Sequence, residues 1–247
     1  MNRAIIQSLI FLFVGTGLLM ADQNLVFKNK TNQYRKSKNL SELKSARWLA
    51  EACKDKASFR KYCDRTSPSW NEKEFREYLW AHNILDVYVR FFQFHEQTAE
   101  GAFSTSGLSK RPKFREALDD KMLNCMGYDV QNDDSGVVVS SIFAKHVVDF
   151  DSVFSGRGYG GLDGSVDMWI DISGKALARG LKYDVGYYAY EDLESIKPVA
   201  TRAVVLDTND RFLLSLQFMP QFPAKAGLWT GVVLFDSGDG VVAFVRK

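Results

Sequence analysis

The feature that most constrains the fold is a change of hydrophobic period near residue 128. Before this point, apolar residues recur at the three- and four-residue spacing of amphipathic helices, whereas after it they alternate with polar residues as in strands. Thirteen of the eighteen glycines also lie after residue 128, where many turns are needed. We therefore predict an α+β protein with an N-terminal three-helix segment followed by an antiparallel β-sandwich or open barrel.

Start and stop signals set the expected helices. Ser69 and Glu72 form a capping box, Pro112 suits a first helical position, and Gly127 suits a C-terminal stop. Asn39 resembles an N-cap for an earlier helix. The helices are predicted over residues 39–57, 69–97 and 112–127.

The clearest strand runs from Arg211 to Met219, where Phe212, Leu214 and Leu216 share one face. Further strands are predicted over Val137 to Phe150, Val166 to Ile172, Leu181 to Glu191, Val199 to Asp207, and a hairpin from Leu228 to Arg246. Gly156 to Gly161 matches a dinucleotide-binding fingerprint, but no helix follows it, so a glycine-rich surface loop is expected there.

The start of the chain predicts export. An apolar run from Ala4 to Met20 follows Arg3 and ends in small residues, as in a secretory signal peptide over residues 1–21 that is cut after Ala21. The alternative is a short membrane anchor formed by residues 4–20, although the lysines and arginines that follow the run oppose that orientation. We expect a periplasmic or secreted protein.

Charge is unevenly distributed along the predicted domains. A basic tether over residues 22–38, a helical domain over 39–127 and a β-rich domain over 128–247 are expected. Lys28 to Arg65 carries a net charge of +8, against −6 from Thr66 onward. This segment could meet a glycan, an anionic surface or an acidic partner, or simply be a solvated face. No nucleic-acid recognition motif accompanies it.

Three cysteines lie in the first half of the chain. Cys53 and Cys63 are the closest pair, so an oxidising compartment predicts a disulfide between them. Cys125 then remains unpaired, and its helical spacing from Phe114 and Leu118 favours a buried thiol.

Catalytic and metal-binding patterns are weak. His82 and His95 would point to different faces of one helix, and His146 fits a core position. Asp163, Asp167 and Asp171 are the exception, because a loop and strand could gather them for glycoside hydrolysis or Ca²⁺ binding. Acidic surface residues are the favoured interpretation, so no metal or cofactor is predicted.

One surface has the character of a binding face. Strand alternation turns Trp169 outward between two aspartates, and it does the same for two tyrosines on the next strand. The predicted partner- or ligand-binding residues are Trp169, Tyr188, Tyr190, Asp167, Asp171 and Asp184. The alternative is that these aromatics form an interdomain core.

Together these features predict an exported cell-envelope interaction protein that binds a partner protein, as an inhibitor, an immunity-type neutraliser or an assembly factor. A carbohydrate-binding module and a glycoside-type hydrolase using Asp163, Asp167 and Asp171 are the alternatives.

Overall fold

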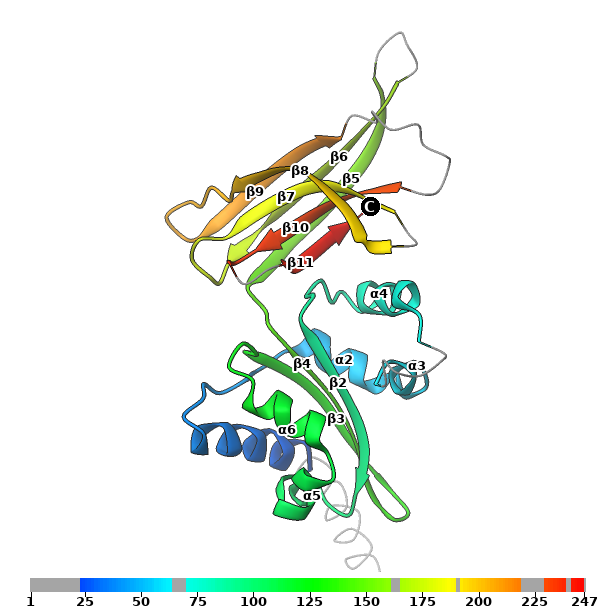
Figure 1. Cartoon of the computed structure of the whole chain (residues 1–247), viewed down its shortest axis with the longest axis vertical. Helices are drawn as coiled ribbons and strands as arrows, with labels where there is room; N and C mark the ends of the chain where they lie inside the picture. Colours follow the sequence, from blue (N-terminus) through cyan, green and yellow to red (C-terminus); the bar gives the residue numbers. More distant parts are fainter. Residues whose placement is uncertain are drawn as a thin grey trace, which may run out of the picture. The chain divides into compact units, whose positions relative to one another are not determined.

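The structure, a computed structural model, describes residues 23–63, 70–160, 165–189, 192–218, 229–238 and 241–246 (Figure 1). The chain divides into two units. The first contains the residues up to Ile84 together with Val89–Ala144, and the second contains Leu85–Tyr88 and the residues from Lys145 onward. The predicted boundary at residue 128 therefore falls within the first unit. The predicted signal peptide lies outside the described residues, and none of the described helices is long and apolar enough to span a bilayer.

The first unit is built on a four-stranded sheet. Its strands follow the order β1 (Lys44–Ser45), β3 (Cys125–Asp133), β4 (Gly136–Ala144) and β2 (Val89–Glu96). The pairs β3–β4 and β2–β4 are antiparallel, whereas β1 pairs with β3 in parallel. β2 is therefore an edge strand.

Helices cover both faces of this sheet. They are a helix over residues 23–37, α2 (Arg47–Lys54), α3 (Lys56–Tyr62), α4 (Glu72–Ala81), η1 (Glu100–Phe103), α5 (Thr105–Ser109) and α6 (Pro112–Asp119). On one face Phe59 and Phe75 pack with Phe91. On the other, Phe114 packs with Phe92 and Phe143. Successive residues of β2 point to opposite faces, so both cores share this strand.

The prediction of a three-helix segment is wrong, because parts of the expected helices are strands. The predicted helix over 69–97 starts at Glu72, capped by the Asn71 side chain, and ends at Ala81. Asn83 then adopts a left-handed φ of 56°. The aromatic-rich stretch Val89–Glu96 pairs with β4 over its whole length, because aromatic and β-branched side chains fit a pleated surface between two cores. The coarser prediction of an α+β protein is confirmed.

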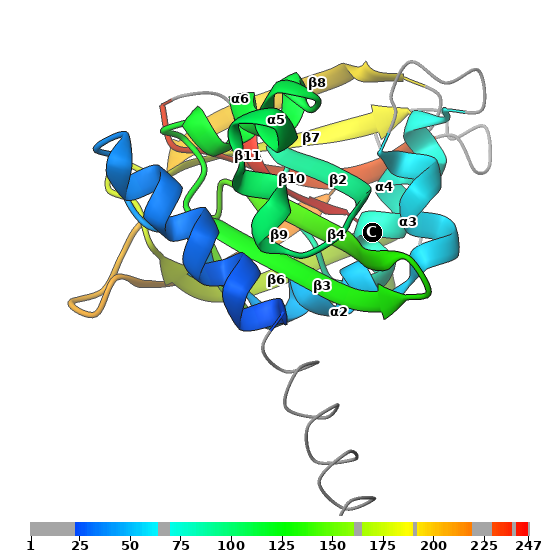
Figure 2. The same cartoon turned by 90° about the horizontal axis from the view of Figure 1, so that it is seen from below.

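Residues 23–37 form a helix where a basic tether was predicted. Phe27, Thr31 and Arg35 are fully buried, and their spacing of four residues places them on one helical face. Asn24 exchanges hydrogen bonds with the main chain of Val130 on β3, along which this helix lies in Figure 2. Asn39, predicted as an N-cap, has a φ of 57° just beyond the end of this helix. Burial of one face therefore overrides the polar composition.

The predicted helix over 112–127 also ends early. Pro112 is at its first turn as expected, but α6 stops at Asp119 and Cys125 opens β3. Gly127 is not a helix stop but a point of close packing in β3. A Cβ at this position would lie 2.2 Å from the carbonyl carbon of Leu49 on α2, so only glycine fits without a shift.

The second unit contains two sheets. One has the order β11 (Val241–Arg246), β10 (Trp229–Asp236), β7 (Lys182–Ala189) and β8 (Asp192–Ala203), and the other has the order β5 (Val148–Gly160), β6 (Ser165–Ala176) and β9 (Arg211–Phe218). Neither closes into a barrel among the strands that the structure describes. Ile172 and Leu214 of one sheet and Phe235 of the other are buried in a single core. The predicted strand from Arg211 and the terminal hairpin are confirmed, whereas Gly156 to Gly160 belong to β5 and not to a loop.

Candidate binding face on the second unit

The candidate site is the outer face of the three-stranded sheet β5–β6–β9. Ile170 and Ile172 of β6 are buried in the core, so alternation turns Trp169 and Asp171 to the opposite side. Trp169 is 38% exposed, Phe154 on β5 is 71% exposed and Leu213 on β9 is 75% exposed. One large apolar side chain from each strand therefore lies in solvent.

The register places these three residues on one face of the sheet. Phe154 pairs with Asp171, and Trp169 is two residues before Asp171 on the same strand. Leu213 pairs with Ser173, two residues after Asp171. Phe154 and Trp169 are therefore diagonal neighbours within reach of each other, whereas Leu213 lies four positions along β9 from Gln217, the partner of Trp169. We name Phe154, Trp169 and Leu213 the outer apolar patch.

Polar side chains order the surface around the patch. Ser215 Oγ donates a hydrogen bond of 2.6 Å to Asp171 Oδ1, and the hydroxyls of Ser152 and Ser173 are 2.8 Å apart. Arg211 forms an ion pair with Asp151 at one end of the sheet. Apolar side chains within a polar frame are typical of a protein-binding surface.

The structure separates the residues that the sequence suggested as one face. Trp169, Asp167 and Asp171 belong to β6, whereas Asp184 and Tyr188 belong to β7 in the other sheet. Tyr190 lies outside the described residues, and the side chains of Asp167 and Tyr188 are outside the described part. Asp184 is half-buried, and its Oδ1 atom has no hydrogen-bond partner among the described residues.

Sequence reasoning missed Phe154 and Leu213. Leu213 left a signal, because it is an apolar residue at a position where the alternation of β9 requires a polar one. Phe154 gave no comparable signal, since it became recognisable only once β5 was seen to continue beyond Phe150. The pairing of β5, β6 and β9 is what places the three residues on one face of the sheet.

The predicted disulfide is not formed: Cys53, Cys63 and Cys125 are all free thiols. Cys53 is buried on α2, whereas the Cys63 thiol donates a hydrogen bond to Phe59 O within its own helical segment. Burial raises the pKa of Cys63 to about 12, so this thiol is protonated and unreactive at neutral pH. Cys125 is buried, as predicted, although on a strand.

Some of the cations of the basic segment are buried or paired within the first unit. Arg35 is completely buried, while Lys30 pairs with Glu100 at 2.5 Å and Lys54 pairs with Glu51 at 3.0 Å. Part of the charge of Lys28 to Arg65 is therefore compensated within the first unit. Arg65 itself lies outside the described residues.

Of the three aspartates predicted to act in hydrolysis, only Asp171 has a side chain that the structure describes. Asp163 lies outside the described residues, and Asp171 accepts its hydrogen bond from Ser215. Across the described ranges, no group of three or more His, Cys, Asp or Glu side chains is placed to hold a metal ion. The hydrolase therefore stays a prediction from the sequence.

The histidines lie at three separate places in the chain and not in a shared site. His82 ends α4, and His95 on β2 is 3.1 Å from Asp133 Oδ1. His146 lies in the second unit between two carboxylates, with Nδ1 2.9 Å from Asp86 and Nε2 2.8 Å from Asp149. Burial alone would lower the pKa of His146, but the two carboxylates outweigh this effect and raise it.

Comparisons with known proteins add little to this site. No protein-family model matches the sequence, and no curated protein matches it either. Among solved structures, the chain is similar to an outer surface protein from Borrelia burgdorferi, with 13% identity and a TM-score of 0.40 over 49% of this chain and 91% of that protein's chain. A similarity of this size indicates nothing about function.

Proposed function

We propose that this chain is an exported cell-envelope protein that binds a partner protein through the outer apolar patch, and that its second unit is a β-sandwich that presents the patch. The observation that carries the proposal is the joint exposure of Phe154, Trp169 and Leu213 on one side of one sheet. Soluble proteins seldom expose several large apolar side chains together unless the surface meets another molecule. The predicted leader supports a location outside the cytoplasm.

The chemistry of the patch favours a protein over a sugar. A glycan site uses an aromatic platform beside polar groups, and Trp169 next to Asp171 would suit one. Leu213 and Phe154 are more exposed than Trp169 and offer no polar atoms, so they would fit the apolar side chains of a protein partner. A carbohydrate-binding module is therefore the second candidate.

The proposal is tested by photo-crosslinking from the patch. A photoreactive phenylalanine analogue at position 154 of the full chain should capture a defined partner in envelope extract, and the same analogue at Val205 serves as the control. Val205 is 82% exposed but lies outside the three-stranded sheet. The captured partner is then purified and its affinity for the chain is measured.

Substitution of the patch decides the outcome. Trp169→Ala should weaken binding of the purified partner by about 2 kcal/mol or more, as expected for a central aromatic anchor. Val205→Ala should leave the affinity unchanged. Equal affinities of the wild-type chain and the Trp169→Ala variant would refute the proposal, and binding to an envelope glycan in place of a protein would establish the second candidate.

A further inference from the structure

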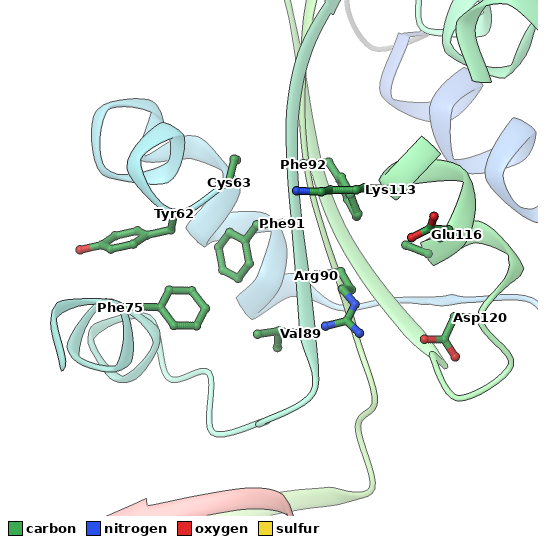
Figure 3. Close-up of a pocket in the computed structure, with 11 residues that line it drawn as sticks. Tyr62, Cys63, Phe75, Val89, Arg90, Phe91, Phe92, Lys113, Glu116 and Asp120 are labelled. Atoms are coloured by element: carbon green, nitrogen blue, oxygen red, sulfur yellow. The ribbon is translucent and has the colours of Figure 1, made fainter. Parts of the chain in front are cut away.

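A groove follows the edge strand β2 in the first unit (Figure 3). Because β2 pairs only with β4 in the described sheet, its other side faces no strand. Tyr62 and Phe75, on α3 and α4, form one wall of the groove. Lys113 and Glu116, on α6, form the other wall.

Two adjoining hollows make up the groove. One has a volume of about 340 Å³ and the other about 300 Å³, and they share Cys63, Phe91, Phe92 and Lys113. Each is as large as a small ligand site. Together they follow much of the length of β2, whose eight residues extend over about 25 Å. An elongated occupant fits this shape better than a compact one.

The main chain of β2 contributes to the floor. Alternate residues of an antiparallel edge strand direct their N–H and C=O groups away from the neighbouring strand. Arg111 Nη2 already donates a hydrogen bond of 3.1 Å to His95 O, so the main-chain groups of His95 point away from β4. By alternation, the main-chain groups of Gln93 and Phe91 point the same way. No hydrogen bond from a described residue reaches the outward groups of Phe91. An extended peptide could supply such a bond.

Charge is arranged unequally along the groove. At the end beside Gln93 and Phe94 the lining includes Lys110, Arg111 and Lys113 and no acidic residue. Arg111 is compensated by Glu96 at 2.5 Å, whereas Lys110 and Lys113 are exposed and form no ion pair with a described residue. At the opposite end, the lining contains Glu116 and Asp120 together with Arg90 and Lys113. The uncompensated cations are therefore concentrated at one end.

We infer that this groove binds an extended peptide segment of a partner protein, with apolar side chains beside the half-buried Phe92 and Phe94 and acidic side chains beside Lys110 and Lys113. Aromatic side chains along a sheet edge provide contact area and the outward main-chain groups of Phe91 provide direction, as in recognition by strand addition. The two lysines would select for acidic sequences. This site uses none of the residues of the outer apolar patch.

A selection experiment tests the inference without a known ligand. A phage library of random peptides, each about eight residues long to match the strand, is selected on the full chain. The enriched peptides are synthesised with a fluorescent label, and their affinities are measured by anisotropy. Amide hydrogen exchange with and without peptide then locates the binding site.

The expected result has three parts. The enriched peptides carry Asp or Glu beside apolar residues, they slow exchange in Val89–Glu96, and the double variant Lys110→Glu with Lys113→Glu weakens their binding by about tenfold or more. The control Lys121→Glu, an exposed lysine outside the groove lining, leaves binding unchanged. A thermal melt of the double variant confirms that it is folded.

Several outcomes would overturn the inference. These are an absence of enriched peptides, enrichment without acidic residues, protection elsewhere in the chain, or affinities that the double variant does not change. Trp169→Ala serves as the independent control, because it should not alter peptide binding. A negative result for peptide binding in the groove would therefore not bear on the proposed function of the outer apolar patch.

Discussion

Substitution of Arg35 should lower the stability of the first unit. Its side chain is completely buried, and burial lowers the pKa of the guanidinium. It nevertheless donates four hydrogen bonds to main-chain carbonyls: Nε to Ser41 at 2.8 Å, Nη1 to Leu118 and Asp120 at 2.9 Å each, and Nη2 to Leu123 at 3.1 Å. One side chain thus links the 23–37 helix to the segment that joins α6 to β3.

The substitution Arg35→Met keeps an unbranched stem and removes the donors. A hydrogen bond to a charged group contributes about 1.5 to 3 kcal/mol, but burying the guanidinium costs several kcal/mol, so the four bonds do not add in full. Each buried carbonyl left without its donor costs about 1 to 3 kcal/mol, and the lost desolvation cost of the guanidinium offsets part of the sum, so the free energy of unfolding of the first unit should fall by about 3 to 5 kcal/mol. Lys36→Met, at an exposed neighbouring position, should change it by less than about 0.5 kcal/mol.

Amide hydrogen exchange measured on peptides from β3 and β4 reports on the first unit alone. A loss of about 3 to 5 kcal/mol should accelerate their exchange by about two to almost four orders of magnitude where exchange requires unfolding. Acceleration of the Arg35→Met variant by less than about fivefold would correspond to under about 1 kcal/mol. That result would refute the assignment of Arg35 as the residue that holds these segments together.

Three further outcomes are expected. Gly127→Ala should destabilise the first unit by about 1 to 3 kcal/mol, because its Cβ would lie within 2.3 Å of main-chain atoms of Leu49 and Ala50; an unchanged melting temperature would contradict this packing. Because the pKa of His146 is raised in the folded state, its charged pairing should stabilise the second unit fully below about pH 6.5. This stabilisation should be lost as the pH rises through the folded-state pKa. The stability difference between the wild-type chain and His146→Gln should therefore shrink towards alkaline pH, and a difference independent of pH would exclude the charged pairing. Alkylation followed by intact-mass analysis should find three protein thiols after unfolding without reductant, whereas a mass consistent with one thiol would show a disulfide.

Local alternation made part of this structure predictable from sequence. The strand from Arg211 to Phe218 and the outward direction of Trp169 follow from a period of two, which depends only on neighbouring residues. The Pro112 start of α6 is local for the same reason. These features required no knowledge of distant parts of the chain.

Other elements depend on partners that are distant in sequence. Val89–Glu96 has residues at helical spacing, but pairing with β4 and burial on two faces decide in favour of a strand. Helix ends at Asn39 and Asn83 use left-handed asparagines, which are weaker signals than glycine. The buried face of the 23–37 helix includes Thr31 and Arg35, whose polarity is typical of a surface, so the sequence did not indicate its burial.

The candidate site shows the same division. Trp169 could be identified by alternation within one strand, whereas its grouping with Phe154 and Leu213 depends on the register of β5, β6 and β9. Residues of β6 and β7 are close in sequence but belong to different sheets, so sequence proximity suggested a face that the sheets divide.

The path of the chain between the two units has a consequence for proteolysis. Leu85–Tyr88 belongs to the second unit although the residues on both sides of it belong to the first, and Asp86 in this segment bonds to His146. A single cut after Ala144 would therefore separate the polypeptide into two fragments while leaving this segment of the N-terminal fragment held in the other fragment by non-covalent contacts. Separation of the two fragments after such a cut would therefore also require breaking the contact between Asp86 and His146.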